Sequence, residues 1–357
     1  MALRKLTRGV NVGGVLIGGG APVTVQSMTS TPTEDADATV AQIKRLEMAG
    51  CDIVRVAVPN RRAAEAIRAI KPSISIPLVA DIHFDHKLAL AALESGADKL
   101  RINPGNIGSA DKVEAVARAA KDRGVPIRVG VNAGSIDRAR YGLPRADSLV
   151  ESALDQVRML EGFGFEDIVI SLKAFDVPMT IEAYRLASER CDYPLHLGVT
   201  EAGLAWEGAI RSAVGIGTLL AEGIGDTLRV SLTADPVEEV RAGVEILASL
   251  GLRAKSFTLV SCPTCGRCAI DLSRIADEVR RRLEAEPPER PLTVAVMGCV
   301  VNGPGEASLA DVGIAGGAGS GAVFAGGKMV RRVSEDRLVD ELMKEVRRVG
   351  SQERADT

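Results

Sequence analysis

Aromatic side chains and surplus charge are what this sequence has least of. Of its 357 residues only 3% are aromatic, three are histidine, and the formal net charge is −3. A chain without a basic surplus lacks the positive field that holds a nucleic-acid backbone, so we expect no nucleic-acid partner. No stretch reaches the roughly 18 apolar residues of a membrane span, and the N-terminal residues lack the apolar segment of a secretory signal. We therefore expect a cytoplasmic protein without membrane association.

Cysteine is also scarce, and its placement is informative. Two of the six cysteines stand alone at positions 51 and 191, whereas the other four fall between residues 262 and 299. Clustered cysteines in a reducing compartment bind metal or carry out redox chemistry more often than they crosslink a chain. The pattern therefore favours a metal centre over a disulfide framework.

Short β-branched runs bounded by turn residues alternate with stretches of helical spacing that end near a glycine. The runs cover residues 23–28, 52–57, 77–81, 98–103, 126–132, 166–171, 194–200 and 227–233. Eight such units in about 250 residues are typical of a closed parallel barrel. A doubly wound open sheet is the alternative, but the segment after the first run, TSTPTEDA, lacks the glycine-rich turn of that fold. We predict an α/β protein with an N-terminal (β/α)8 TIM-type barrel over residues 1–254.

Beyond Gly251 the pattern changes, which predicts a smaller C-terminal α/β domain over residues 255–357. Its expected strands are FTLVS, LTVAVMG, DVGIAG and AVFAGG, followed by the amphipathic helix VSEDRLVDELMKEVRRV. The glycine-rich segment GGAGSGA at 316–322 favours a hairpin turn over an anion-binding loop.

Two cysteine motifs in this second domain carry the strongest local signal: SCPTCGRC at 261–268 and MGCVVNGPGEA at 297–307. Thiolates at CxxC spacing bind one soft metal centre, and the spacing favours an iron–sulfur cluster. A structural zinc site made by all four clustered cysteines is the main alternative. A buried apolar cysteine cluster is a third interpretation.

A second group of polar residues lies at the predicted carboxyl ends of the barrel strands, where active sites of this fold are built. Alternate strand residues share a face, which pairs Arg101 with Asn103 and Arg128 with Asn132. Buried cations need a counter-charge, and acids nearby are few. Because guanidinium and ammonium groups match phosphate oxygens, we predict a diphosphate ligand. The substrate-binding residues expected at this end are Arg55, Asp81, His83, Arg101, Asn103, Arg128, Asn132, Ser171, Lys173, His196, Thr200, Arg229 and Ser231.

Carboxyl and imidazole groups in the predicted barrel allow two further interpretations. Asp81, His83 and His86 could form a metal site, but we expect His83 and His196 to donate hydrogen bonds to substrate and His86 to begin a helix. Glu201, in GVTEAG, is the candidate general acid, because desolvation at this position would favour its protonated form. It could instead pair with Lys173.

These motifs together, with VQSMT, ADIHFD and KLRINPGNIG, closely resemble the bacterial 4-hydroxy-3-methylbut-2-enyl diphosphate synthases along nearly the whole chain. The resemblance implies a two-electron reduction of 2-C-methyl-D-erythritol 2,4-cyclodiphosphate, with ring opening and loss of a hydroxyl group, in isoprenoid precursor synthesis. It also implies flavodoxin or ferredoxin as electron donor, and a homodimer in which the cluster domain of one chain closes over the other chain's barrel.

The resemblance further implies that Cys262, Cys265, Cys299 and Glu306 hold a 4Fe–4S cluster and that Glu201 is the catalytic acid. Cys268 departs from the family pattern, and it could compete with Glu306 for the fourth iron. Two other functions stay open at this point: a zinc-stabilised barrel aldolase or phosphohydrolase, and a non-catalytic electron carrier.

Overall fold

The structure is a computed structural model that describes residues 2–352. The chain divides into two compact units between Arg253 and Ala254.

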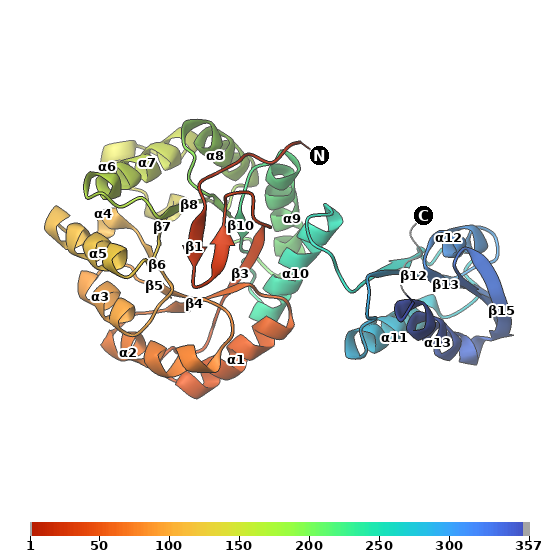
Figure 1. Cartoon of the computed structure of the whole chain (residues 1–357). Helices are drawn as coiled ribbons and strands as arrows, with labels where there is room; N and C mark the ends of the chain where they lie inside the picture. Colours follow the sequence, from red (N-terminus) through yellow and green to blue (C-terminus); the bar gives the residue numbers. More distant parts are fainter. Residues whose placement is uncertain (1, 353–357) are drawn as a thin grey trace. The chain divides into compact units, whose positions relative to one another are not determined.

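The first unit is built on a single sheet of eight parallel strands in the order β8-β7-β6-β5-β4-β3-β10-β9. A bridge between Ile170 and Leu195 joins β8 to the residues before β9, which closes the sheet into the predicted barrel (Figure 1). The strands are β3 Thr24–Met28, β4 Ile53–Ala57, β5 Leu78–Asp81, β6 Lys99–Ile102, β7 Ile127–Asn132, β8 Ile168–Lys173, β9 His196–Leu197 and β10 Thr227–Leu228. The last two are far shorter than the runs 194–200 and 227–233, because the chain leaves the ladder after Leu197 and Leu228 and continues as loops.

Helices surround the strands on all sides (Figure 1). Their starts follow from local sequence, since the side chains of Asp35, Asn60, Asp85, Asp176 and Asp235 each accept a hydrogen bond from a first-turn amide. The helices are α1 Ala36–Met48, α2 Arg61–Ile70, η1 Lys71–Ser73, α3 His86–Glu94, α4 Pro104–Ile107, α5 Ala110–Asp122, η2 Ala133–Ser135, α6 Arg138–Tyr141, α7 Ala146–Gly162, α8 Val177–Arg190, α9 Ala205–Ala221 and α10 Pro236–Ser249. The prediction that His86 begins a helix is confirmed.

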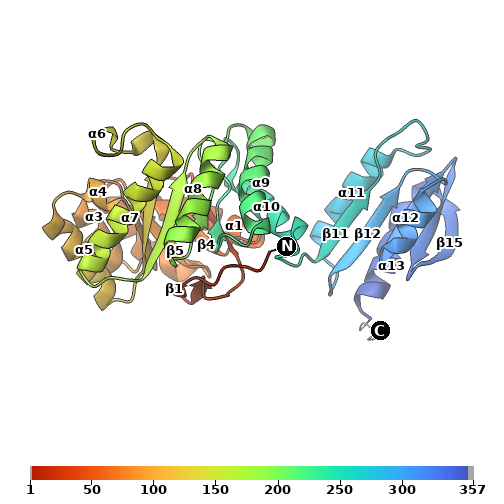
Figure 2. The same ribbon diagram turned by 90° about the horizontal axis from the view of Figure 1, so that it is seen from above.

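An N-terminal hairpin that the sequence analysis missed closes the amino-terminal end of the barrel. Strands β1 Val10–Val12 and β2 Val15–Ile17 are antiparallel, and Gly13 and Gly14 form the turn with φ of 54° and 98°. Such a turn needs positive φ, and the dipeptide Gly-Gly is a known hairpin signal. Apolar hairpin residues pack against strand residues that face the interior; the cluster is Val10, Val12, Ile17, Ile53, Val79 and Val169. Figure 2 shows β1 at the opposite end of the barrel from α6.

The second unit has a five-stranded sheet in the order β11-β12-β13-β14-β15, parallel from β11 to β13 and antiparallel beyond. Apolar residues of α11 and α13 pack on one face of this sheet, and Ala307 of α12 packs on the other. The elements are β11 Phe257–Ser261, α11 Leu272–Ala285, β12 Leu292–Met297, α12 Gly303–Leu309, β13 Val312–Gly317, β14 Ser320–Ala325, β15 Lys328–Ser334, η3 Glu335–Arg337 and α13 Leu338–Gly350.

Two details of this unit bear on the predictions. The glycine-rich segment at 316–322 is a hairpin turn between β13 and β14, as predicted. The strand β15 was missed, and the closing helix begins at Leu338 instead of Val333. The reason is that β15 is exposed on both faces and shows no alternation of apolar and polar residues. Within residues 2–352, no helix is both long enough and apolar enough to cross a membrane.

Candidate active site and metal centre

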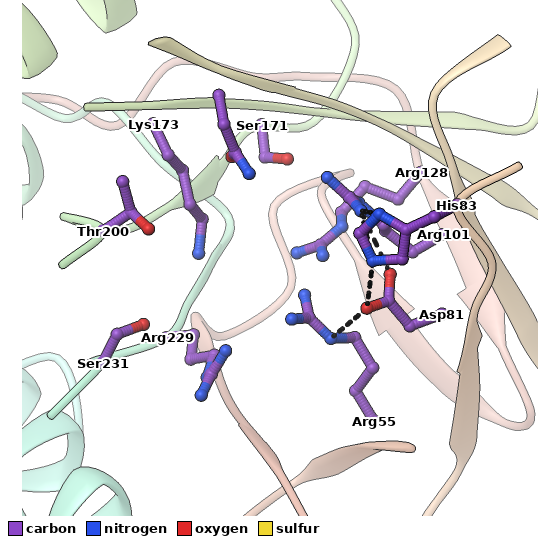
Figure 3. Close-up of a pocket in the computed structure, with 11 residues that line it drawn as sticks. Arg55, Asp81, His83, Arg101, Arg128, Ser171, Lys173, Thr200, Arg229 and Ser231 are labelled. Atoms are coloured by element: carbon purple, nitrogen blue, oxygen red, sulfur yellow. Dashed lines mark hydrogen bonds and ion pairs between the residues drawn. The ribbon is translucent and has the colours of Figure 1, made fainter. Parts of the chain in front are cut away.

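A cavity of about 110 Å³ opens where the carboxyl ends of the barrel strands converge (Figure 3). Part of its lining comes from strands, where alternation turns the side chains inward. His83, Thr200, Arg229 and Ser231 come instead from the segments that directly follow β5, β9 and β10. Every lining residue belongs to the set predicted from sequence. They are Arg55, Asp81, His83, Arg101, Arg128, Asn132, Ser171, Lys173, Thr200, Arg229 and Ser231.

Asp81 organises one side of the cavity. Its carboxylate accepts hydrogen bonds from Arg101 Nη1 at 3.2 Å and from His83 Nε2 at 3.2 Å, and lies 3.8 Å from Arg55 Nε. Figure 3 shows these three partners around Asp81. Arg55 also donates to the sulfur of Met28 at 2.9 Å. One carboxylate therefore orients two guanidinium groups and one imidazole toward the same space.

Lys173, Thr200, Arg229 and Ser231 lie across the open space from Asp81 (Figure 3). Arg229 Nη2 bonds Glu239 Oε2 at 3.2 Å, and Glu239 is almost fully buried on α10. Its carboxylate also accepts a hydrogen bond from the Leu232 amide at 2.9 Å, which fixes the loop that follows Arg229. A helix residue thus holds the second cationic side of the cavity in place.

Two glycines give the long cations room inside the barrel. A Cβ on Gly130 would lie 2.6 Å from Arg101 Nε, and a Cβ on Gly198 would lie 2.7 Å from Lys173 Nζ. A Cβ atom does not approach a nitrogen that closely, so a side chain at either position would displace the cation. Arg101 Nη2 also donates to the Gly130 carbonyl at 3.3 Å.

The electrostatic balance of the cavity is strongly positive. Of the described lining residues five are Arg or Lys and one, Asp81, is a carboxylate. Burial raises the pKa of Asp81, but the nearby Arg55 guanidinium, the His83 hydrogen bond and Arg101 together hold it far below its ordinary value. Burial and the neighbouring guanidinium groups lower the pKa of Lys173 well below its ordinary value. An anionic ligand would relieve this repulsion.

Three predicted residues are not among the described lining residues. Asn103 lies beside a different cavity, formed with α6 and α7. His196 is fully buried and absent from the described lining of the cavity, and burial lowers its pKa well below the ordinary value. Glu201 is exposed, forms no ion pair with Lys173 in the described part of the chain, and has a left-handed φ of 51°. The desolvation expected at Glu201 is thus missing in the single chain.

The histidine metal site considered from sequence is not formed. His83 bonds Asp81, whereas His86 Nδ1 lies 3.5 Å from Asp85, the residue that caps α3. Between Ala2 and Gln352, no three His, Cys, Asp or Glu side chains converge closely enough to hold a single metal ion.

A second cavity, of about 300 Å³, lies at the ends of β11 and β12, which are adjacent and parallel. Cys262 follows the first strand and Cys299 the second, so the sheet brings the two distant motifs together. Cys265 and, from the first turns of α12, Glu306 complete the metal-binding donors around this cavity.

Backbone amides surround the sulfurs of this cavity. The Gly298 amide donates to Cys262 Sγ at 3.2 Å. Hydrogen bonds from the amides of Asn302 and Val301 lower the pKa of Cys299, and the Arg267 amide does the same for Cys265. Amides that stabilise thiolates are what iron–sulfur sites provide.

Cys268 is oriented differently from the other three clustered cysteines. Its thiol donates to the Ile270 carbonyl at 3.2 Å, and its partly buried side chain packs against the apolar core of the unit, as that of Cys262 also does. A Cβ on Gly298 would lie 2.5 Å from Cys268 Sγ, so the glycine makes room for it. Cys268 is absent from the described lining of the cavity, whereas Glu306 contributes to it. A zinc site made by all four cysteines is therefore not supported, whereas Cys262, Cys265, Cys299 and Glu306 all line the same cavity.

Sequence reasoning missed two charged residues of these sites. Glu239 was not considered, although its position four residues before Gly243 on the core-facing side of α10 could have indicated a buried carboxylate. Arg267 was also missed; it lies beside Cys265 at the edge of the second cavity. A basic residue between two cysteines of a motif was the available signal.

Comparison with known proteins gives matches over both units. The GcpE TIM-barrel domain matches residues 7–244, and the GcpE protein C-terminal domain matches residues 258–348. A protein of Caldanaerobacter subterraneus subsp. tengcongensis named 4-hydroxy-3-methylbut-2-en-1-yl diphosphate synthase (flavodoxin) is 57% identical, with 98% of this chain and 99% of that protein covered. A protein of the same name from Geobacter sulfurreducens is 59% identical, covering 97% and 99% of the two chains.

A solved structure matches about two thirds of the chain. Type I 3-dehydroquinate dehydratase from Clostridium difficile superposes with a TM-score of 0.51 at 14% identity, covering 69% of this chain and 98% of that one. At this identity the likeness shows the barrel fold and carries no information on activity.

The clearance at Gly130 gives the first prediction. In Gly130→Ala the new methyl group displaces Arg101 from the Gly130 carbonyl and from Asp81. We expect the affinity for inorganic pyrophosphate, measured by calorimetry, to fall about tenfold, or roughly 1.4 kcal/mol. The control is Gly217→Ala on α9, where a Cβ meets open space; its affinity should equal that of the wild type. Unchanged affinity in a folded Gly130→Ala variant would show that Arg101 does not bind the anion.

Proposed function

The chain belongs to the GcpE family of 4-hydroxy-3-methylbut-2-en-1-yl diphosphate synthases, and we propose that its residues divide the reaction between the two cavities described above. As an oxidoreductase of isoprenoid precursor synthesis, it opens 2-C-methyl-D-erythritol 2,4-cyclodiphosphate by a two-electron reduction and removes a hydroxyl group. In this proposal the barrel binds the cyclodiphosphate, and the C-terminal unit carries the electron-transfer centre.

The observation that carries the proposal is the excess of buried cations in the barrel cavity. Arg55, Arg101 and Arg128 on one side and Lys173 and Arg229 on the other lack enough carboxylates to balance them. A cyclic diphosphate supplies both the missing charge and the oxygens that guanidinium forks bind in pairs. Asn132, Ser171, Thr200 and Ser231 can complete the set with neutral hydrogen bonds.

Cys262, Cys265, Cys299 and Glu306 would hold a 4Fe–4S cluster, and such a cluster supplies electrons one at a time. Three thiols anchor this position, and backbone amides already stabilise their thiolate forms. A carboxylate is a harder and weaker ligand for iron than a thiolate, so Glu306 can give way where a fourth cysteine could not. We therefore propose Glu306, and not Cys268, as the fourth ligand.

Glu201 is the proposed proton donor to the departing hydroxyl group. It follows Thr200, which lines the barrel cavity, and its left-handed backbone turns the chain sharply at this point. Non-glycine residues rarely adopt that conformation, and they do so chiefly at functional sites. Because the carboxyl group is exposed in the single chain, its desolvation requires a second surface to cover the cavity.

We propose that a second copy of the chain provides this surface. Helix α9 exposes an apolar stripe of Trp206, Ile210 and Val214, with exposed fractions of 75%, 47% and 53%. The spacing of four residues puts these side chains on one side of the helix, as expected for a contact between subunits. In the proposed homodimer, the cluster-bearing unit of one chain covers the barrel cavity of the other and excludes water.

Flavodoxin is the proposed electron donor, with ferredoxin as the alternative, because the curated relatives carry flavodoxin in their names. All six cysteines are free thiols, which suits a reducing compartment and supports a cytoplasmic location. A zinc-stabilised aldolase or phosphohydrolase is not favoured, since Cys268 is absent from the described lining of the second cavity and the family match covers both units.

An anaerobic assay tests the function directly. Protein purified without oxygen should be brown, contain iron and inorganic sulfide, and convert the cyclodiphosphate to the linear allylic diphosphate with reduced flavodoxin. The Cys299→Ser variant should lose colour and activity together. Absence of sulfide from the anaerobically purified wild type would refute the proposal.

The fourth ligand is tested by a pair of variants. Because Glu306 lines the cavity and Cys268 does not, Glu306→Ala should lower the activity at least 100-fold and change the electron paramagnetic resonance spectrum of the reduced protein. Cys268→Ser should keep the wild-type spectrum and activity. The reverse outcome would assign the ligand to Cys268.

Assembly across subunits is tested with two differently tagged variants, Arg128→Met and Cys299→Ser, each expected to be inactive alone. They are co-expressed and the doubly tagged heterodimer is purified. If the barrel of one chain works with the cluster of the other, one of the two sites is intact, and the heterodimer should show about half of the wild-type activity. An inactive heterodimer would show that each chain works within itself, and failure to obtain doubly tagged protein would contradict the homodimer.

A further inference from the structure

A layer of polar side chains lies inside the barrel below the cavity. Strand alternation places Gln26 of β3 below Met28, Lys99 of β6 below Arg101, and Thr227 of β10 below Arg229. The side chains of Arg128 of β7 and His196 of β9 also lie inside the barrel. The exposed fractions of Gln26, Lys99, Arg128, His196 and Thr227 are 1%, 0%, 1%, 0% and 0%. Barrel interiors at this depth are ordinarily filled by branched apolar side chains.

Much of this layer has no hydrogen-bond partner within the described residues. The atoms without one include Lys99 Nζ, both ring nitrogens of His196, both amide atoms of Gln26 and the Thr227 hydroxyl. A buried polar group without a partner is unfavourable, and an unpaired buried charge is more so. A lysine in this position is therefore stable as a neutral amine unless an anion comes close.

The surroundings of Lys99 contain cations and no carboxylate paired with it. The positive charges of Arg128 from β7 and Arg55 from β4 repel a charge on Lys99. His196 from β9 lies close enough to Lys99, and to Lys173 from β8, for their charges to affect its ring. The nearby acids form ion pairs with other residues. Asp81 of β5 pairs with Arg55, Arg101 and His83, and Glu239 of α10 pairs with Arg229. Burial, followed by Arg128 and Arg55, lowers the pKa of Lys99 well below its ordinary value.

Apolar side chains flank the layer: Ile53 is paired with Gln26, Val79 with Lys99 and Val169 with Arg128 in the strand ladders. These three residues pack with the apolar residues of the β1–β2 hairpin. Above the layer stand the cations of the cavity. A multiply charged anion bound there would be the nearest uncompensated negative charge to the amine. In a low-dielectric interior, charges interact strongly over such distances even without contact.

We propose that Lys99 is a proton-uptake site coupled to the barrel cavity: its amine is neutral in the free protein and becomes an ammonium group when a diphosphate binds above it. The proton comes from solvent and binds the free electron pair of Nζ, with no other bond changed. The inference rests on the proposed diphosphate-binding function. It makes Lys99 a positioning residue that adjusts the interior charge to the ligand, without touching it.

The experiment is calorimetric titration of the anaerobically prepared holoenzyme with inorganic pyrophosphate at pH 8, in buffers of different ionisation enthalpy. The dependence of the observed heat on the buffer gives the number of protons taken up per pyrophosphate bound. Lys99→Met and Lys99→Gln are compared with Lys44→Met, which removes an exposed lysine of α1. Because protons carried by pyrophosphate itself are the same in all titrations, the difference between variants isolates Lys99.

We expect both Lys99 variants to take up about one proton fewer per bound pyrophosphate than the wild type and Lys44→Met. Uptake equal to that of the wild type in a folded Lys99 variant would overturn the proposal. If neither variant folds, Lys99→Arg replaces them, because its guanidinium keeps a fixed positive charge: uptake equal to that of the wild type overturns the proposal, and uptake lower by about one proton supports it. Absence of pyrophosphate binding would instead overturn the diphosphate-binding function and this inference with it, which distinguishes the two failures.

Discussion

Positive charge without an internal counter-charge is the constraint on which the barrel of this protein depends. Arg55, Arg101, Arg128, Lys173 and Arg229 converge on one small space. The carboxylate of Asp81 orients Arg55 and Arg101, and that of Glu239 orients Arg229, so the cations outnumber the acids. The repulsion among these cations lowers the stability of the empty protein, and a bound anion relieves it. The site therefore favours ligand binding at a cost in folding stability. The glycines at positions 130 and 198 show that the backbone itself is adapted to this purpose, because they admit cations where a side chain would collide.

The cysteine cavity also gathers groups of one charge, but there the groups are negative. Three thiols there are surrounded by backbone amides, which favour their negative form, and Arg267 adds a positive charge at the edge. In the proposed function, the barrel presents cations to an anionic ligand, whereas the C-terminal unit presents anionic donors to a positively charged metal centre. Each site is incomplete with respect to charge, and the two deficits have opposite sign. The proposed homodimer, in which one unit covers the other chain's barrel, would bring the substrate and the electron source together.

Much of this could be predicted from the sequence, because strand alternation is a strict geometric rule. Once Arg128 and Asn132 are placed on one strand of a parallel barrel, their shared direction and common end of the barrel follow. The rule failed for Asn103, because β6 ends at Ile102 and Asn103 lies beside another cavity. What could not be predicted depends on side-chain direction outside the strands. Glu239 reaches the site from a helix, Cys268 bonds the Ile270 carbonyl although its spacing resembles that of a ligand, and His196 is buried and absent from the described lining of the cavity. The strand β15 escaped prediction because it lacks a buried face.

The hairpin at the amino-terminal end of the barrel has a consequence for turnover. Val10, Val12 and Ile17 fill that end of the barrel with apolar side chains. The cavity described above is therefore entered from the other end, where the carboxyl ends of the strands converge. Product must leave through the passage by which substrate entered, so the two cannot pass each other. In the proposed homodimer, the unit that covers this opening must withdraw once in every catalytic cycle, and the rate of that withdrawal sets an upper limit on the turnover rate of the enzyme.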